Sequence, residues 1–261
     1  MLLALDIGNT NIVIGVYHQA QWLHHWRVET VASRMPDEYA IIFRQLFASA
    51  QIQYSDFSQI IVSSVVPQLT HGIVSQLNQY ADVNPQVLST DKLKNFAVAT
   101  EPAQATGTDL LANGIAAYHR YRRDCIVVDF GTATTIMATR SPGVFQGGAI
   151  CAGLHTTIKA LVSETAQLPF VALQAPPSII GNNTVHAMQS GLIWGHLSMV
   201  EGLVARMKSA LANDAVVVAT GGLATLLAAH TDCFDAVDPW LTLDGLRLAI
   251  SEYMHVGSTD E

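Results

Sequence analysis

The sequence is short of charged residues and has no stretch rich in lysine or arginine. Only 13% of its 261 residues are charged, and 13 Lys and Arg stand against 21 Asp and Glu, which gives a formal net charge of −8. The densest basic stretch contains only Arg120, Arg122 and Arg123. Surfaces that bind nucleic acid or anionic membranes are strongly basic. The composition therefore argues against nucleic acid and against a membrane as partners.

Cysteine is also scarce. Its three positions, Cys125, Cys151 and Cys233, are scattered along the chain and odd in number. They show neither the spacing of a metal site nor the even count of a disulfide framework. This pattern is typical of a protein in a reducing compartment, and we expect a cytoplasmic location.

No long hydrophobic run is present. The most apolar later stretch, residues 215–229, is interrupted by Gly221 and Gly222, and it is shorter than the ~20 residues that span a membrane. The N-terminus has no basic region and carries Asp6 within its apolar run, unlike a signal peptide. The sequence thus predicts neither a transmembrane helix nor a cleaved leader.

Hydrophobic residues, in contrast, make up 50% of the chain, enough for one large core or two modest ones. The most informative part of the sequence is residues 2–17. An apolar run there ends on Asp6, a turn of small and polar residues follows, and a second apolar run begins after the turn. Such runs around glycine and asparagine predict two buried strands joined tightly. Gly8 would let the backbone approach a ligand, and Asp6 is a hard oxygen ligand suited to Mg²⁺. The pattern predicts a site for a metal-bound polyphosphate, with an ordinary hairpin as the alternative.

Residues 125–139 repeat this arrangement. A β-branched run ends on Asp129, an Asp-Phe-Gly step reaches Gly131, and several threonines precede an apolar return. Internal repeats determine the architecture of a chain. We therefore expect an α/β protein of two duplicated domains, residues 1–118 and 119–261, with a ligand-binding cleft between them.

Helix and strand patterns fill the rest of the chain. We expect strands at residues 21–28, 59–66, 87–88, 147–154 and 215–220, and helices at residues 36–50, 70–80, 109–118, 156–164, 185–211, 223 onward and 243–254. Asp109 would lie at a helix start, where it either caps the helix or faces a ligand. Three glycines inside the longest helix, Gly191, Gly195 and Gly202, predict close packing against another element, such as a second subunit.

Residues 6–11, residues 129–135 and the pair Gly221-Gly222 after a strand resemble the phosphate and adenosine elements of the actin, sugar-kinase and chaperone-ATPase superfamily. More narrowly, the chain resembles the type III pantothenate kinases, on stretches that run from one end to the other: LDIGNTN, HHWRVET, DEYA, SSVVPQLT, VVDFGTATT, GGAICAGL, GNNTVHAMQSG and ATGGLA. The resemblance implies two ribonuclease-H-like (actin-like ATPase) domains. It also implies ATP-dependent phosphorylation of pantothenate to 4'-phosphopantothenate, the first step of coenzyme A synthesis.

The resemblance further implies roles for individual residues. The ATP phosphates would be held by Asp6, Ile7, Gly8, Asn9, Thr10, Asn11, Ile12 and Val13, with Asp6 close to Mg²⁺, while Thr132 would contact ATP. Asp129 would bind a monovalent cation, K⁺ or NH₄⁺. The pantothenate pocket would contain Gly107, Thr108, Asp109, Leu110 and Thr184, with Asp109 as the general base. Members of the family are homodimers with substrate sites at the interface, so we expect a homodimer that binds ATP and pantothenate.

The chemistry of phosphoryl transfer agrees with these roles, because it depends mostly on positioning and charge neutralisation. An ordinary aspartate has a reference pKa of about 3.9 and is ionised at neutral pH. We therefore expect Asp109 to accept a proton without special tuning of its pKa.

The sequence departs from the family pattern on the pantothenate side. Leu110 follows Asp109 where the family has arginine, and residues 99–102 (Ala-Thr-Glu-Pro) lack the tyrosine that contacts substrate in the family. Two alternatives therefore stay open. The chain could be a catalytically weak nucleotide-binding homologue with a regulatory role, or a kinase for another small hydroxyl compound.

Overall fold

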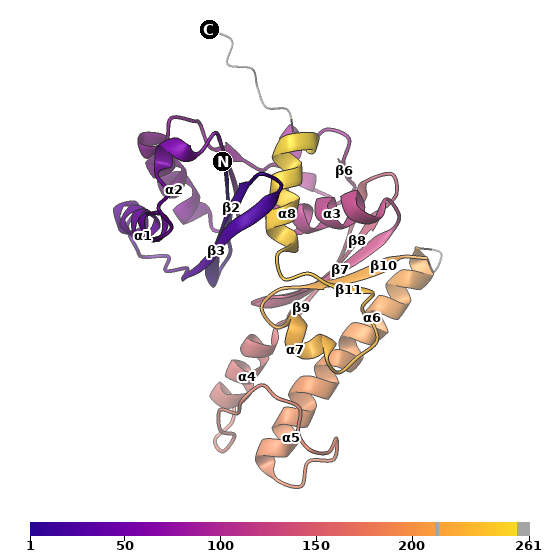
Figure 1. Cartoon of the computed structure of the whole chain (residues 1–261). Coiled ribbons are helices and arrows are strands. Elements are labelled where there is room, and N and C mark those ends of the chain that lie inside the picture. The colour runs from indigo at the N-terminus through magenta and orange to yellow at the C-terminus, as the bar shows by residue number, and fades with distance from the viewer. Residues whose placement is uncertain (212–213, 255–261) are drawn as a thin grey trace. The chain divides into compact units, whose positions relative to one another are not determined.

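The computed structural model describes residues 1–211 and 214–254, and these fall into two compact units (Figure 1). The first unit consists of residues 1–116 together with the chain from Leu241, and the second consists of residues 117–240. The division after residue 116 lies close to the expected boundary at residue 118. The sequence-based boundaries assigned the C-terminal segment to the second domain, whereas its described part groups with the first unit.

The first unit is built on a mixed sheet of five strands in the order β3-β2-β1-β4-β5. Its strands are β1 (Leu2–Ile7), β2 (Asn11–His18), β3 (Gln21–Glu29), β4 (Gln59–Ser64) and β5 (Gln86–Val87). β1 pairs antiparallel with β2, from Leu2 opposite Tyr17 to Ile7 opposite Ile12, so the predicted hairpin is confirmed. β1 also pairs in parallel with β4, which places the carboxyl ends of these two strands at one edge of the sheet.

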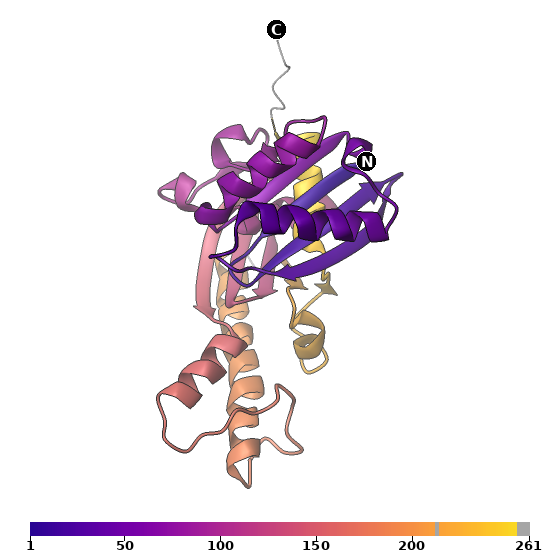
Figure 2. The same cartoon turned by 90° about the vertical axis from the view of Figure 1, so that its left-hand side faces the viewer.

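Helices cover both faces of this sheet. α1 (Pro36–Ser49) and α2 (Pro67–Tyr80) pack against each other over one face, as Figure 2 shows. α1 buries Tyr39, Phe43 and Phe47, which are spaced four residues apart and therefore lie on one side of the helix. The other face is covered by α8 (Leu241–Leu248), which packs on β1 and β4.

The contacts of α8 explain why the C-terminal segment belongs to the first unit. Gly245 lies so close to the backbone of Ala112 in α3 (Thr108–Tyr121) that a Cβ atom would not fit. Trp22 on β3 donates a hydrogen bond from Nε1 to Asp244 Oδ1 at 2.9 Å. These contacts join residues more than a hundred positions apart, and helical periodicity alone does not identify such partners.

The second unit repeats the topology of the first. Its strands run in the order β11-β10-β7-β8-β9, and they are β7 (Cys125–Phe130), β8 (Ala133–Arg140), β9 (Val144–Ala152), β10 (Val216–Thr220) and β11 (Ala236–Val237). β7 pairs antiparallel with β8 and in parallel with β10, as β1 does with β2 and β4. The register toward the third strand also shifts at corresponding places, after Val16 and after Ala138. The predicted α/β duplication is thus confirmed in strand order and register.

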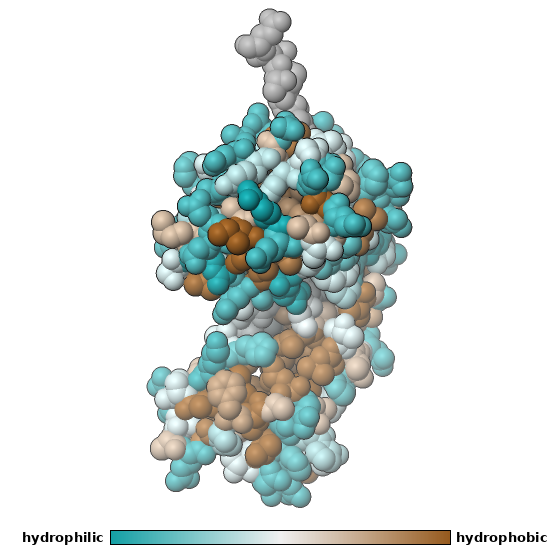
Figure 3. Space-filling model, turned by 60° about the vertical axis from the view of Figure 1, so that its left-hand side comes forward, coloured by the Kyte–Doolittle hydropathy of each residue, from teal (hydrophilic) through white to brown (hydrophobic). Residues whose placement is uncertain are grey.

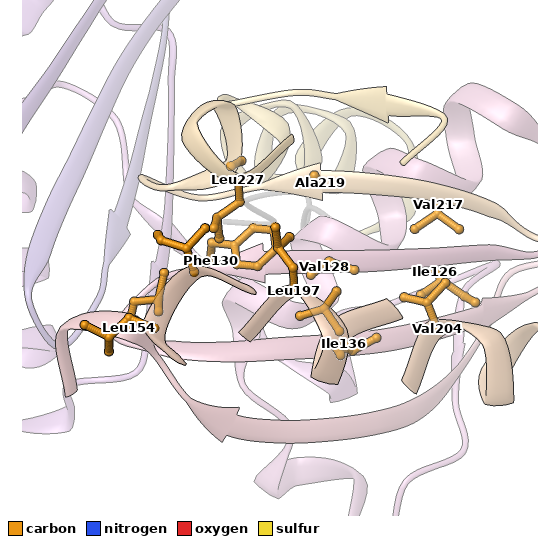
Figure 4. Packing of buried hydrophobic residues seen from close by; sticks show 14 of the residues in the cluster. Ile126, Val128, Phe130, Ile136, Leu154, Leu197, Val204, Val217, Ala219 and Leu227 are labelled. Atoms are coloured by element: carbon orange, nitrogen blue, oxygen red, sulfur yellow. The ribbon is translucent and has the colours of Figure 1, made fainter. Parts of the chain in front are cut away.

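The core of the second unit lies between its sheet and two helices, α4 (Leu154–Ser163) and α6 (His196–Ala210). Ile126, Val128 and Phe130 alternate along β7, so their side chains share one face of the sheet. Figure 4 shows Leu197 and Val204 of α6 packed on this face, in one buried cluster with the strand residues. This packing holds β7, the strand that carries Asp129 near its end.

The predicted long helix is interrupted by a change of helix type. α5 (Thr184–Ser190) leads into a π-helical segment, η4 (Gly191–Gly195), and the chain then continues as α6. Apart from the neighbouring residues and the nearby backbone of the same helix, no atom of the described residues lies within 4 Å of a Cβ placed at Gly191 or Gly195. The structure therefore shows no packing partner for these two glycines, and the expected packing against a second subunit stays a prediction.

Other elements differ from the sequence-based expectation mainly at their ends. The strand expected at residues 59–66 ends at Ser64, and Pro67 is the first residue of α2, a position that proline favours. The short elements are η1 (Tyr54–Asp56), η2 (Thr90–Lys92), β6 (Ala97–Val98), η3 (Ala103–Ala105), α7 (Ala224–Ala228) and a second π-helical segment, η5 (Ala249–Tyr253). Within residues 1–211 and 214–254, no helix is both long and apolar enough to cross a membrane.

Candidate functional site

The turn of the first hairpin presents polar groups on a rigid base. The Gly8 N–H donates to the Asn11 carbonyl at 3.0 Å, which closes the turn, and Asn9 and Thr10 between them are exposed. Ile7 and Ile12 flank the turn and are fully buried in the core. Of the expected phosphate-binding residues, these two can therefore offer only backbone groups to a ligand.

A threonine that the sequence did not single out holds this turn in place. Thr30 follows β3, donates from Oγ1 to the Gly8 carbonyl at 2.7 Å, and donates from its backbone N–H to the Thr10 carbonyl at 2.8 Å. The next residue is fixed in turn, because the Val31 N–H donates to the buried hydroxyl of Tyr39 at 2.8 Å. The stretches HHWRVET and DEYA thus support the turn rather than line it.

Asp109 lies in the first turn of α3 and is not its N-cap. The helix begins at Thr108, and the Leu110 N–H donates to Asp109 Oδ1 at 2.9 Å. A Cβ at Gly107 would collide with this carboxylate, which explains the glycine. Burial raises the pKa of Asp109 above its ordinary value, although the hydrogen bond from Leu110 opposes the shift. The expectation of an untuned aspartate is therefore wrong, and a raised pKa makes this carboxylate a stronger base.

The first unit brings the turn strand and the Asp109 segment together. Asp6 near the end of β1 lies opposite Ser63 on the parallel strand β4. Ser63 Oγ is 2.9 Å from Thr108 Oγ1, and Thr108 is the residue before Asp109. Neighbouring strands are about 4.8 Å apart, so Asp6, Ser63 and Thr108 form one short row at the edge of the sheet.

The second hairpin has a shorter turn with its own support. The Gly131 N–H donates to the Ala133 carbonyl at 3.0 Å, and Thr132 between them is exposed. Thr156 on α4 donates from Oγ1 to the Thr132 carbonyl at 2.9 Å. A Cβ at Gly153 would collide with the carbonyl oxygens of this turn, so only glycine allows α4 to start so close. The expected ATP contact, Thr132, is thus presented on a fixed backbone.

Asp129 lies where the second hairpin meets β10. Its register partner on β10 is Thr220, which is buried, and Gly221 follows with φ +91°. A Cβ at Gly221 would collide with the Asp129 carboxylate and the Phe130 backbone. Glycine is therefore required at this position both by the backbone conformation and by the close approach. Carboxylate, hydroxyl and carbonyl oxygens at this strand end are the ligand types that hard cations prefer.

A buried histidine also contacts the second hairpin, and the sequence did not indicate it. His196, the first residue of α6, has Nε2 2.9 Å from Thr134 Oγ1, and both side chains are buried. Burial lowers the pKa of His196, so the neutral ring is favoured. His196 supports β8 just after the turn that carries Thr132.

Thr184 lies at the start of α5, beside a groove of the second unit. Asn183 caps this helix, because its Oδ1 accepts from the His186 N–H at 2.9 Å. The groove has a volume of about 690 Å³ and an uncharged lining: Thr157, Leu161, Leu168, Gly181, Asn182, Asn183, Thr184, Ala187, Met188, Gly191 and Leu192. Figure 3 shows apolar side chains gathered over the α4–α5 end of this unit, where Phe170, Ile179 and Ile180 are exposed.

The expected site residues therefore fall into two groups. The first unit holds residues 6–13 and 107–110, and the second holds Asp129, Thr132 and Thr184. Within the described residues, no cluster of three or more His, Cys, Asp or Glu side chains could hold a metal ion by itself. The two units thus each contribute a polar turn and one carboxylate at a strand end.

Comparison with known proteins identifies the family. The sequence model described as "Type III pantothenate kinase" matches residues 2–206. A protein of that name from Myxococcus xanthus is 42% identical over 248 residues, which cover 95% of this chain and 97% of the relative. The chain belongs to the type III pantothenate kinase family. The resemblance on which the sequence analysis relied is thereby confirmed.

Solved structures of low sequence identity support the fold of this type III pantothenate kinase family member. The ethanolamine utilization protein EutJ from Carboxydothermus hydrogenoformans has a TM-score of 0.56 at 15% identity, covering 94% of this chain and 88% of the other. An inorganic polyphosphate/ATP-glucomannokinase from Arthrobacter has a TM-score of 0.52 at 15% identity, covering 95% and 97%. At such identity the likeness concerns the fold alone, and it agrees with the predicted duplicated α/β architecture.

The Thr30 contacts generate a first prediction for this family member. Thr30→Val keeps the side-chain shape and removes one hydrogen bond to the turn, a change of about 0.5–1.5 kcal/mol. If the turn holds the phosphates of ATP, the KM for ATP should rise roughly 2- to 12-fold. The KM for the acceptor should stay unchanged, because Thr30 contacts only the phosphate turn. Steady-state kinetics with each substrate varied in turn measures both values.

A matched control is Thr165→Val. Thr165 donates from Oγ1 to the Leu161 carbonyl at 2.7 Å, so the variant loses the same kind of bond at an exposed site away from both turns. Its KM for ATP should equal that of the wild type. An unchanged KM for ATP in Thr30→Val would show that this threonine does not hold the nucleotide turn.

Proposed function

We propose that this chain transfers the γ-phosphoryl group of ATP to the primary hydroxyl of pantothenate and forms 4'-phosphopantothenate, the first step of coenzyme A synthesis. Membership of the type III pantothenate kinase family supports this function. The observation that carries the proposal is the row formed by Asp6, Ser63 and Thr108, which sets Asp109 beside the strand of the phosphate turn.

The phosphate turn supplies binding rather than covalent chemistry. The backbone of residues 7–12 and the exposed side chains of Asn9 and Thr10 offer donors to phosphate oxygens. Asp6 provides a carboxylate at the strand end, and one or two carboxylates with substrate phosphates are enough to hold Mg²⁺. The residues present therefore fit Mg-ATP, and the bound metal would neutralise charge on the phosphates.

Asp109 would orient the attacking hydroxyl and accept its proton. Phosphoryl transfer needs a positioned base near the nucleophile, and this carboxylate is held by the first turn of α3. Its raised pKa brings its basicity nearer to the operating pH, where a general base is most effective. Gly107 and Leu110 beside it would contribute to the acceptor pocket, and Thr184 is a further candidate for contact with the acceptor.

Asp129 would hold a monovalent cation, K⁺ or NH₄⁺, next to the nucleotide. The proposal is supported by the oxygen-rich strand end around Asp129, Thr220 and Gly221. Thr132 on the adjacent turn would contact ATP.

We also propose that the chain works as a cytoplasmic homodimer. The exposed apolar side chains at the α4–α5 end of the second unit, among them Phe170, Ile179 and Ile180, support a self-associating surface. Substrate sites at such an interface would involve the groove beside Thr184, which lies in the same unit.

One specific observation favours an acceptor other than pantothenate. Leu110 next to Asp109 offers no charge to bind the pantothenate carboxylate, and the groove around Thr184 has no charged lining residue. A kinase for an uncharged hydroxyl compound, or a weak nucleotide-binding homologue, would tolerate these features. A coupled assay with ATP, Mg²⁺, K⁺ and a panel of alcohols that includes pantothenate distinguishes the three functions.

Asp109→Asn tests the general base. Loss of a general base usually lowers turnover by about 10²–10⁴-fold, whereas ATP binding should barely change. When kcat/KM of the wild type is measured against pH, the apparent pKa of the acid limb should be higher than that of an ordinary aspartate, because burial raises the pKa of Asp109. A variant that keeps near wild-type turnover would exclude this role.

The same variant should be more stable at neutral pH. The pKa of Asp109 is higher in the folded state than in the unfolded state, so ionisation of this carboxyl lowers the free energy of unfolding. This stability is present at low pH and is lost as the pH rises through the folded-state pKa. Asn removes the charge, so the melting temperature of the variant should exceed that of the wild type at pH 8. The difference should vanish at a pH below the unfolded value of about 3.9.

Activity should depend on the monovalent cation. We expect higher rates with K⁺ or NH₄⁺ than with Na⁺ at equal ionic strength, and Asp129→Ala should abolish this difference. Rates are measured at saturating pantothenate and Mg-ATP in each chloride salt. Equal rates in all three salts for the wild type would contradict a cation site at Asp129.

Leu110 should weaken the binding of pantothenate. An arginine beside the catalytic aspartate would form a charge-assisted hydrogen bond with the pantothenate carboxylate, a contribution of about 1.5–3 kcal/mol. Its absence should raise the KM for pantothenate by roughly 10- to 150-fold, and Leu110→Arg should lower that KM. The KM for ATP serves as the internal control and should not move. If Leu110→Arg changes neither value, this account of the acceptor pocket is wrong.

A further inference from the structure

Four hydroxyl side chains gather where β4 ends and α2 and α3 begin. This hydroxyl cluster consists of Ser63, Ser64, Thr70 and Thr108. Thr70 Oγ1 donates to Ser64 Oγ at 2.7 Å, and Ser63 Oγ lies 2.9 Å from Thr108 Oγ1. The cluster joins residues up to 45 positions apart in the sequence.

The hydroxyl of Thr108 is fully used within the protein. A threonine hydroxyl can donate one hydrogen bond and accept two. Thr108 Oγ1 accepts from the Ser64 N–H at 3.0 Å, donates to the Ser64 carbonyl at 3.3 Å and pairs with Ser63 Oγ at 2.9 Å. No capacity is left for a substrate, although Thr108 lies in the segment expected to bind one.

Ser63 connects this hydroxyl to the phosphate strand. Its side chain is fully buried, and its register partner on β1 is Asp6. Asp109 is the next residue after Thr108, in the same helical turn. The pair of Ser63 and Thr108 therefore links β4, the strand paired with β1, to the turn that carries Asp109.

We propose that Ser63 and Thr108 act as a positioning pair for phosphoryl transfer. Their hydrogen bond holds the first turn of α3 in register with β1, so that Asp109 keeps a fixed place relative to the phosphate turn. The inference rests on the proposed role of Asp109 as the base. It assigns Thr108 to positioning and not to substrate contact.

The rest of α3 has separate anchors, so cutting this link should loosen only its first turn. Thr242 Oγ1 donates to Asn113 Oδ1 at 2.8 Å, and Gly245 packs on the backbone of Ala112. These contacts lie one turn further along the helix than Thr108. A misplacement of about 1 Å at a reacting group can cost around 10²-fold in rate, so a small shift of Asp109 should be visible in turnover.

The test compares Thr108→Val, Ser63→Ala and the double variant with the wild type. Each single variant should lower kcat by roughly 10- to 100-fold, with the KM for pantothenate and for ATP within about twofold of wild type. The double variant should be no slower than Thr108→Val alone, because Thr108→Val already removes the bond to Ser63 together with the two contacts to Ser64. Thr108→Ser, which keeps the hydroxyl, should restore kcat. A matched control is Thr70→Val, which removes a hydroxyl of the cluster without touching the pair and should leave kcat unchanged.

A second readout does not require activity. Hydrogen exchange should become faster at the amides of residues 110–112 in Thr108→Val and Ser63→Ala, and should remain as in the wild type in Thr70→Val. A wild type that fails to phosphorylate pantothenate would overturn the proposed function, and the exchange data would then decide on the link alone. Unchanged exchange, a raised KM for pantothenate at constant kcat, or strictly additive losses of kcat would each overturn the positioning pair.

Discussion

The lateral pairing of a hairpin strand with a parallel strand is the constraint on which both halves of this protein depend. β1 lies between β2 and β4, and β7 lies between β8 and β10, in equivalent registers. Each pairing sets a carboxylate at the strand end, Asp6 or Asp129, beside a buried hydroxyl. A slip by one residue would turn each carboxylate to the opposite face of its sheet and into the core. The alternation of buried side chains along these strands therefore fixes the face on which each carboxylate lies, and not only the fold.

The sequence predicts the hairpins well because their information is local. An apolar run that ends on Asp, followed by a small residue step with glycine, specifies strand, turn and strand within about a dozen residues. The candidate site residues on these turns could be proposed from the sequence for the same reason. Thr30, Ser63 and His196 could not, since each acts through a hydrogen bond to a residue 22 to 62 positions away. Their side-chain types are common, and only the fold gives them a partner.

The ends of helices and the elements on which helices pack are also poorly predicted from the sequence. The apolar face of α8 predicts a helix, but it does not say which sheet the helix covers, and it groups with the first unit through Gly245 and Asp244. Periodicity likewise predicts helix across residues 185–211 without revealing the π-helical turn at Gly191–Gly195, because a single turn of five residues is too short to change the apolar pattern of the whole segment. The sheet that α8 covers is decided by tertiary contacts, and a short window of sequence does not contain them.

The two hairpin turns differ in length, but a threonine hydroxyl holds each of them in the same way. In each, a threonine from the chain after the third strand donates to a turn carbonyl: Thr30 to Gly8, and Thr156 to Thr132. Thr30 lies directly after β3, whereas Thr156 lies on α4. This helix can begin close to the second turn only because Gly153 has no Cβ atom. The first turn also contains one more residue between its paired strands and exposes both Asn9 and Thr10. The longer turn with more donors is the one proposed to hold the phosphates, which carry more charge than the rest of a nucleotide, so the difference in turn length agrees with that proposal.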